Sequence, residues 1–230
     1  MSDQTHQSSR SKPVESQRLD AFVDAAFAFA VSLLIIAGGE PLRSFDNLLD
    51  ALARIPAFLC GFALIVMFWL AHRAWSSLGP RRDGRATLLS LAIVFSVLVF
   101  VFPLRLLTET GAHFISGGRL PGAGLLASFD QLGWTYMIYG LGFSFLSVLF
   151  ALLFRQAKAT IEPGDADGRR AARSWMRTWT LAAVTGVLSG LVALSPALAA
   201  APWLPGVTYW LIPIGIMVLG AMDRRRARRS

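Results

Sequence analysis

The chain has 230 residues, of which 54% are hydrophobic and only 16% are charged, against about a quarter charged in an ordinary soluble domain. Its net charge is +8, but the basic residues are spread between apolar runs, so we expect no nucleic-acid partner. One cysteine, Cys60, excludes an internal disulfide, and no Cys/His cluster suggests a metal site or cofactor.

Six runs are long and apolar enough to cross a bilayer, since a spanning helix needs roughly 20 apolar residues. They lie at about 21–37, 56–75, 86–107, 131–154, 178–199 and 203–222. We therefore predict an all-α integral membrane protein with six transmembrane helices. The predicted parts are a disordered tail (1–17), the six-helix domain (18–222) and a basic tail (223–230).

The basic residues alternate from one side of the predicted membrane to the other. Of the 22 Lys and Arg residues, 18 fall in the two tails and in the second and fourth loops, and 4 fall in the other loops. Cytoplasmic loops carry an excess of Lys and Arg. This pattern predicts a multi-pass protein of the cytoplasmic membrane, with both termini inside and with arginines touching anionic lipid headgroups.

One face of span 1 carries bulky apolar side chains and a single hydroxyl. The spacings of 3, 4, 3 and 4 residues place them on one side of a helix: Phe22, Ala25, Phe29, Ser32 and Ile36. An ordinary packing stripe has this pattern. A pore of stacked apolar rings that exclude water, with one polar ring, has the same pattern.

Ionisable groups inside a bilayer are costly and are candidates for function. Asp24, one turn into span 1, and His72, at the end of span 2, are predicted at the same depth, level with Thr87 and Ser90 of span 3. They form either an inter-helix contact that fixes packing, or a gate or proton site.

Later segments give structural signals. Residues 42–55 predict a short amphipathic helix or an extension of span 2. Pro103 predicts a kink near the outer end of span 3, before a Gly-rich loop at 108–130. Gly186 and Gly190 permit close helix packing in span 5. No nucleotide-binding or hydrolase motif occurs, so we expect no enzyme.

Two motifs resemble a known family. Arg18 to Asp24, with Phe22 between them, resembles the R-x-x-x-F-S-D signature of the transmembrane protein 175 family, potassium channels of lysosomes and prokaryotes. Trp69 and His72 look like the W-x-x-H at the end of that family's second span. The resemblance is strong over residues 18–75, modest to 107, and beyond that rests on topology.

The resemblance implies a mechanism. Four copies of span 1 would line a pore in a homotetramer that binds and passes potassium. Carried over by position, the apolar constriction falls on Phe29, the selectivity hydroxyl on Ser32 and a second apolar ring on Ile36. The motif residues Arg18, Phe22, Asp24, Trp69 and His72 would form the inter-helix network.

Three residues depart from the family pattern. Val23 replaces the motif serine, Phe29 is larger than the usual Ile or Leu, and the only asparagine is Asn47, in a loop rather than in span 3. We predict a passive monovalent-cation channel, with two alternatives left open. One is a proton-coupled carrier that uses Asp24 and His72. The other is a non-conducting scaffold in the membrane.

Overall fold

Helices make up almost all of the part of the chain that the computed structural model describes, which is residues 14–36, 43–122, 124–126 and 128–227. The elements are α1 (Val14–Ile36), α2 (Phe45–Ala53), α3 (Ile55–Ser77), α4 (Gly84–Ile115), α5 (Phe129–Thr160), α6 (Ala166–Ala193), α7 (Ala197–Ala200), α8 (Leu204–Val207), the 3₁₀ turn η1 (Thr208–Trp210) and α9 (Leu211–Ala227). The predicted all-α fold is confirmed.

Six segments of the described chain are long and apolar enough to cross a membrane, as the sequence predicts. Two bounds were predicted wrongly. The third span continues to Ile115, so it takes up part of the predicted 108–130 loop, and Pro103 lies inside the helix rather than at its end. The fifth span ends at Ala193 rather than near residue 199, and the basic segment before it is the first part of the same helix, α6.

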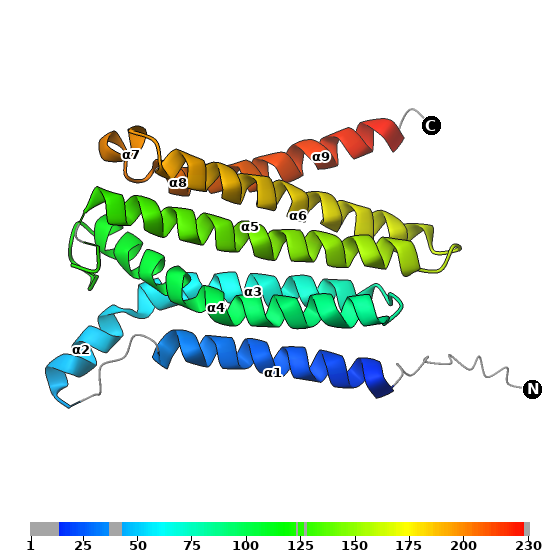
Figure 1. The fold of residues 1–230 in the computed structure, drawn as a ribbon, viewed down its shortest axis with the longest axis horizontal. Coiled ribbons are helices and arrows are strands. Elements are labelled where there is room, and N and C mark those ends of the chain that lie inside the picture. The colour runs from blue at the N-terminus through cyan, green and yellow to red at the C-terminus, as the bar shows by residue number, and fades with distance from the viewer. Residues whose placement is uncertain (1–13, 37–42, 123, 127, 228–230) are drawn as a thin grey trace, which may run out of the picture.

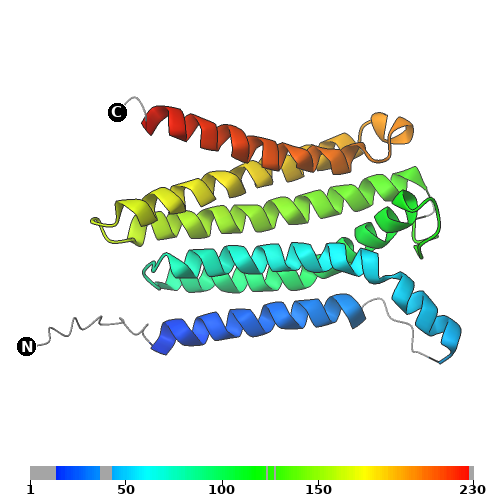
Figure 2. The same ribbon diagram turned by 180° about the vertical axis from the view of Figure 1, so that it is seen from behind.

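The long helices lie side by side and antiparallel (Figures 1 and 2). One end of the bundle carries the α3–α4 and α5–α6 loops, the start of α1 and the end of α9. We call it the basic end, because the chain's arginines gather in these segments. The opposite end carries α2, α7 and the α4–α5 connection, and we call it the α2 end. The even number of crossings puts both described ends of the chain on one side.

Aromatic rings form the centre of the core. Phe68 of α3 is fully buried and packs on Phe100 of α4, on Phe143 and Phe150 of α5 and on Trp179 of α6. The Phe150 and Trp179 rings stack with their centroids 4.6 Å apart. These contacts join the first three spans to the second three through α5.

Glycines let α5 and α6 approach closely. A Cβ atom built on Gly186 would lie 2.7 Å from the carbonyl oxygen of Gly140, and one built on Gly140 would lie 2.6 Å from that of Gly186. Such distances leave no room for a side chain, so the packing role predicted for Gly186 is confirmed. The partner glycine on α5 was not predicted.

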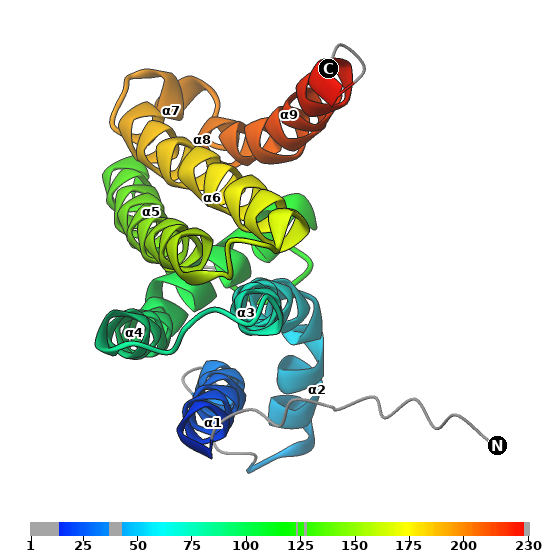
Figure 3. The same cartoon turned by 90° about the vertical axis from the view of Figure 1, so that its right-hand side faces the viewer.

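The two edges of the bundle are α1 and α9. Seen along the helices, α1 lies at one extreme, against α3 and α4, and α9 lies at the other, against α6 (Figure 3). The segment 42–55 forms the separate helix α2, capped by the Ser44 hydroxyl, which accepts a hydrogen bond from the Asn47 amide. The predicted tail 1–17 falls largely on residues 1–13, which lie outside the described part.

Candidate functional site

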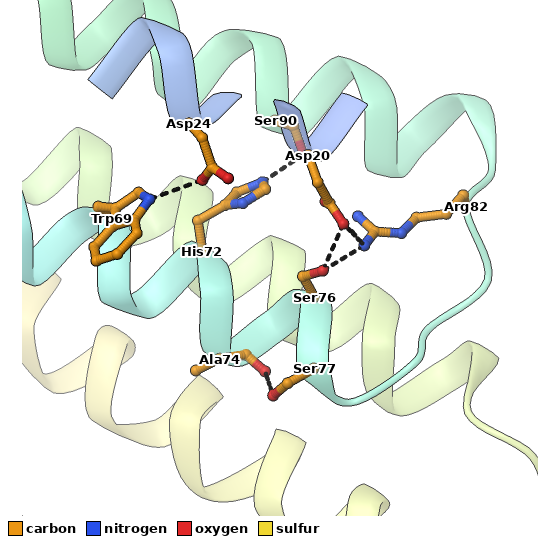
Figure 4. A network of polar contacts seen from close by, with 9 residues as sticks. All are labelled: Asp20, Asp24, Trp69, His72, Ala74, Ser76, Ser77, Arg82 and Ser90. Atoms are coloured by element: carbon orange, nitrogen blue, oxygen red, sulfur yellow. Dashed lines mark hydrogen bonds and ion pairs between the residues drawn. The ribbon is translucent and has the colours of Figure 1, made fainter. Parts of the chain in front are cut away.

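A cluster of polar side chains joins α1, α3 and α4 near the basic end (Figure 4). Asp20 and Asp24 stand one turn apart on α1, and α3 faces them with residues at spacings of three and four. The α3–α4 loop and the first turns of α4 complete the set. Its members are Asp20, Asp24, Trp69, His72, Ser76, Arg82 and Ser90.

Asp24 and Trp69 link the two sequence motifs directly. The Trp69 indole Nε1 donates a hydrogen bond of 2.8 Å to Asp24 Oδ1. The Arg73 guanidinium lies 4.9 Å from the Trp69 ring centroid, over its face. A carboxylate accepting from an indole N–H is a charge-assisted hydrogen bond, which is stronger than a neutral one. The pair therefore ties α1 to α3 at a fixed height.

His72 bonds to Ser90, one of the two span 3 residues predicted at its depth, rather than to Asp24. Its Nε2 lies 3.0 Å from Ser90 Oγ of α4, and both side chains are buried. Figure 4 shows the Asp24 carboxylate beside the His72 ring, and the structure places no hydrogen bond between them. Thr87, which was expected to join this level, donates to the Asp83 carbonyl of its own helix instead.

A second branch of the cluster was missed by the sequence analysis. Arg82 Nη2 donates to Asp20 Oδ2 at 3.0 Å and to Ser76 Oγ at 2.7 Å, and Ser76 Oγ donates to Asp20 Oδ2 at 2.8 Å. The Arg82 guanidinium also lies 4.2 Å above the Trp75 ring centroid. Burial lowers the pKa of Arg82, and the Asp20 carboxylate opposes that shift.

The α3–α4 loop is shaped to bring Arg82 back onto α3. Gly79 has φ of +62°, a left-handed conformation that glycine adopts without strain. Gln156 of α5 donates to the Arg81 carbonyl at 2.7 Å, which fixes the loop from the other side. The sequence signal that could have predicted this branch of the cluster is the spacing of Asp20 and Asp24, which puts both carboxylates on one helix face.

The predicted stripe on span 1 lies on the side of α1 that its own chain leaves open. Phe22, Phe29 and Ile36 are 52%, 56% and 69% exposed, and Ala25 and Ser32 are also exposed. The opposite side packs on α3 and α4 through Val23, Phe27, Ala30 and Leu34, each at most 4% exposed. Ser32 Oγ donates to the Ala28 carbonyl at 3.2 Å, so the hydroxyl proton is used within the helix and the oxygen can still accept.

The structure divides the residues predicted for the network. Asp24, Trp69 and His72 all belong to the polar cluster. Phe22 does not, because it lies on the open face of α1. Arg18 is exposed in the first turns of α1 and contributes no hydrogen bond to the cluster as described.

A buried carboxylate at the α2 end was also missed. Glu109 of α4, 5% exposed, accepts from Arg54 Nη1 and from Arg105 Nε, each at 2.7 Å. These three residues border a cavity of about 280 Å³ whose other walls include Leu34 and Phe58. The i,i+4 spacing of Arg105 and Glu109 was a usable signal, but span 3 was expected to end before Glu109.

The two clusters have the character of inter-helix ties. Both join charged groups to partners on other elements at bonding distance, and the buried carboxylate of Glu109 has the paired partners that a buried charge requires. Among the described residues, no group of three or more His, Cys, Asp or Glu side chains is placed to hold a metal ion. Other spans also expose apolar side chains, as membrane helices do, but the exposed face of α1 from Phe22 to Ile36 is the one that the sequence analysis singled out as a candidate pore lining.

Comparison with known proteins gives matches of sequence. Residues 18–103 match the family model described as endosomal/lysosomal potassium channel TMEM175. A potassium channel of Marivirga tractuosa is 28% identical over 155 residues, covering 62% of this chain and 60% of that protein. A potassium channel of Chamaesiphon minutus is 30% identical over 106 residues, covering 43% and 52%. The chain therefore spans somewhat more than half the length of these relatives.

Two solved structures share the fold. A crystallised variant of the potassium channel MtTMEM175 superposes with a TM-score of 0.76 at 24% identity, over 90% of this chain and 93% of that one. The lysosomal potassium-selective channel TMEM175 homologue from Chamaesiphon minutus gives 0.60 at 20% identity, over 90% and 98%. The resemblance to the TMEM175 family that the two motifs predicted is thus confirmed, by sequence over residues 18–103 and by fold over 90% of the chain.

Proposed function

We propose that the chain is one subunit of a passive monovalent-cation channel, selective for potassium, in which four copies assemble and their α1 helices line the pore. The observation that carries the proposal is the two-sided character of α1. Its Phe27 side is packed against the chain's own α3 and α4, whereas its Phe29 side is exposed in the part of the subunit that the structure describes. In a tetramer, the exposed stripe of each α1 helix would face the other three copies and line the central pore.

The composition of the open face suits a narrow conduction path. Phe29 lies at its middle, with Ser32 about one turn further along and Ile36 a turn beyond that. A ring of apolar side chains excludes water, so a cation passes only when the ring widens or when the ion sheds its hydration. Four Ser32 oxygens would then offer polar ligands immediately beyond the constriction.

The choice of potassium rests on the relatives. The matched family and both sequence relatives are described as potassium channels, and the bilayer is the environment that six apolar helices require. Enzyme activity is not part of the proposal. From the basic loops we place the protein in the cytoplasmic membrane, with both termini on the cytoplasmic side.

At Val23, which departs from the family pattern, the surrounding packing accommodates the changed side chain. Val23 is fully buried, so its two methyl groups fill the space between α1 and its neighbours where the motif has a hydroxyl. Asp24 and His72, the residues of the carrier alternative, each have a fixed partner, Trp69 and Ser90. That arrangement favours a structural role for them over a transported proton.

Flux measurements on the purified protein in liposomes test the proposal. We expect potassium flux down its gradient, sodium flux that is slower, and no dependence on a proton gradient. Turnover that saturates at carrier-like rates and follows the proton gradient would support the carrier instead. Protein that reconstitutes as a tetramer but passes neither ion would support the scaffold.

A further inference from the structure

An open groove separates α6 from α9 toward the basic end, far from the polar cluster. Its volume is about 610 Å³. The groove is apolar along most of its length and has one charged residue among the described residues that line it. Its walls are formed by Arg177, Thr180, Leu181 and Val184 of α6 and by Leu219 and Met222 of α9.

The groove exists because the two helices are held together at one end only. Toward the α2 end, Ser189 Oγ of α6 donates at 2.9 Å to the Pro205 carbonyl of α8, which leads through η1 into α9. Near mid-height, Leu181 packs against Gly215, where an added Cβ would lie 2.3 Å from the leucine side chain. Beyond Gly215 the helices diverge, and α9 leans away from α6 (Figures 1 and 3).

The mouth of the groove is basic. Arg173 is exposed one turn before Arg177 on the same face of α6, and Arg169 precedes it by another turn. Arg169 donates to the Pro163 carbonyl, and Arg170 is paired with Asp167. The guanidinium at the mouth suits the phosphate headgroup of a phospholipid, and the apolar walls behind it suit an acyl chain.

The position of the groove favours a lipid over a neighbouring subunit as its occupant. The edge formed by α6 and α9 lies opposite α1 in the end-on view (Figure 3). If α1 lines the pore, as proposed above, this edge is the outermost part of the assembly and faces the bilayer. The inference therefore rests on the proposed function for the choice of lipid over a second copy.

We propose that this groove binds one anionic phospholipid of the cytoplasmic leaflet. The phosphate lies against Arg177, with Arg173 adding a second positive charge, and an acyl chain follows Leu181, Val184 and Leu219 toward the membrane centre. Basic pockets between helices on the cytoplasmic side select anionic headgroups in this way.

Native mass spectrometry of the full-length protein in detergent tests the site, with phosphatidylglycerol and phosphatidylcholine added in equal amounts. We expect preferential retention of phosphatidylglycerol. Arg177→Gln should weaken that retention about fivefold, and Leu219→Trp, which fills the groove, should weaken it as well. The matched control is Arg155→Gln, an exposed arginine near the basic end of α5 that does not line the groove. Thermal melting of each variant shows whether it is folded.

Four outcomes would overturn the proposal. They are equal loss in Arg155→Gln and Arg177→Gln, equal retention of the two lipids, displacement of the lipid by free glycerol 3-phosphate, and a disulfide-linked dimer from Leu219→Cys in a Cys60→Ser background. Potassium flux of the same preparations separates this from the channel proposal. Lost lipid selectivity with flux intact refutes the lipid site alone, and lipid selectivity without flux refutes the channel alone.

Discussion

Phe27 and Phe29 are two residues apart on α1 and face opposite surroundings. Phe27 is 4% exposed and belongs to the core with Val23 and Ala30, whereas Phe29 is 56% exposed. Both are equally apolar, so sequence alone assigns them the same solvation cost. Their difference follows from which side of α1 the neighbouring helices cover, and it makes the pair a matched test of the pore.

Phe29→Ala is expected to raise cation flux in liposomes and to weaken the discrimination between potassium and sodium. Replacing four phenyl groups by methyl groups widens the apolar ring and admits water. Because Phe29 packs on little of its own chain, expression and thermal stability of the subunit should change little.

Phe27→Ala serves as the control and should behave in the opposite way. Removing a buried phenyl ring costs about 3–5 kcal/mol of folding free energy, so we expect lower yield and a lower melting temperature without a gain in flux. Should the two alanine variants behave alike, this face of α1 does not line a pore.

Asp24 is expected to act in assembly through its bond to Trp69. Asp24→Ala removes the acceptor of the 2.8 Å bond and leaves the partly buried Trp69 indole N–H without that partner, which weakens the attachment of α1 to α3. Size-exclusion chromatography in mild detergent should show less tetramer. Asp24→Asn keeps an acceptor oxygen and should retain more. Normal assembly combined with flux that no longer responds to pH would instead indicate a proton site.

At the scale of elements, the contact between α5 and α6 is set by two glycines. Gly140 and Gly186 bring the two backbones so close that each would place a Cβ within 2.7 Å of the other's carbonyl oxygen. Backbone atoms cannot rotate away as a side chain can, so the helices themselves have to separate to admit a methyl group.

Gly186→Ala is therefore expected to lower the free energy of unfolding by about 1–3 kcal/mol, the usual cost of overpacking. Gly111→Ala in α4 is the matched control, because nothing lies within 4 Å of its added Cβ. In a helix this control change should be neutral or slightly stabilising. Thermal melting in detergent compares the two variants. Equal melting temperatures would show that α5 and α6 can separate at little cost to admit a methyl group.

At the scale of the whole molecule, the bundle puts the start of α1 and the end of α9 at its basic end (Figure 1). Reporter fusions after Ser230 and near Gly118 are expected to lie on opposite sides of the membrane, cytoplasmic and external. The reason is that 18 of the 22 basic residues lie in alternate segments. If both reporters lie on the same side, the six-span topology is wrong.

The sequence by itself determined the number of spans, the alternation of basic loops and the two motifs at the first and second spans. These features depend on local hydrophobicity and on spacing along one helix, both of which a sequence displays directly. It also placed Asp24 and His72 at one depth, because depth follows from position along a span.

The tertiary structure decided which groups meet. Asp24 accepts a hydrogen bond from Trp69 rather than from His72, and His72 bonds to Ser90. These partners depend on how each helix is rotated about its own axis. Packing sets that rotation, and the hydropathy of the sequence does not predict it. The contacts of Arg82 with Asp20 and of Arg54 with Glu109 join residues 62 and 55 positions apart. Only the fold brings such pairs together, and only packing on α3 and α4 left Phe29 open while it buried Phe27.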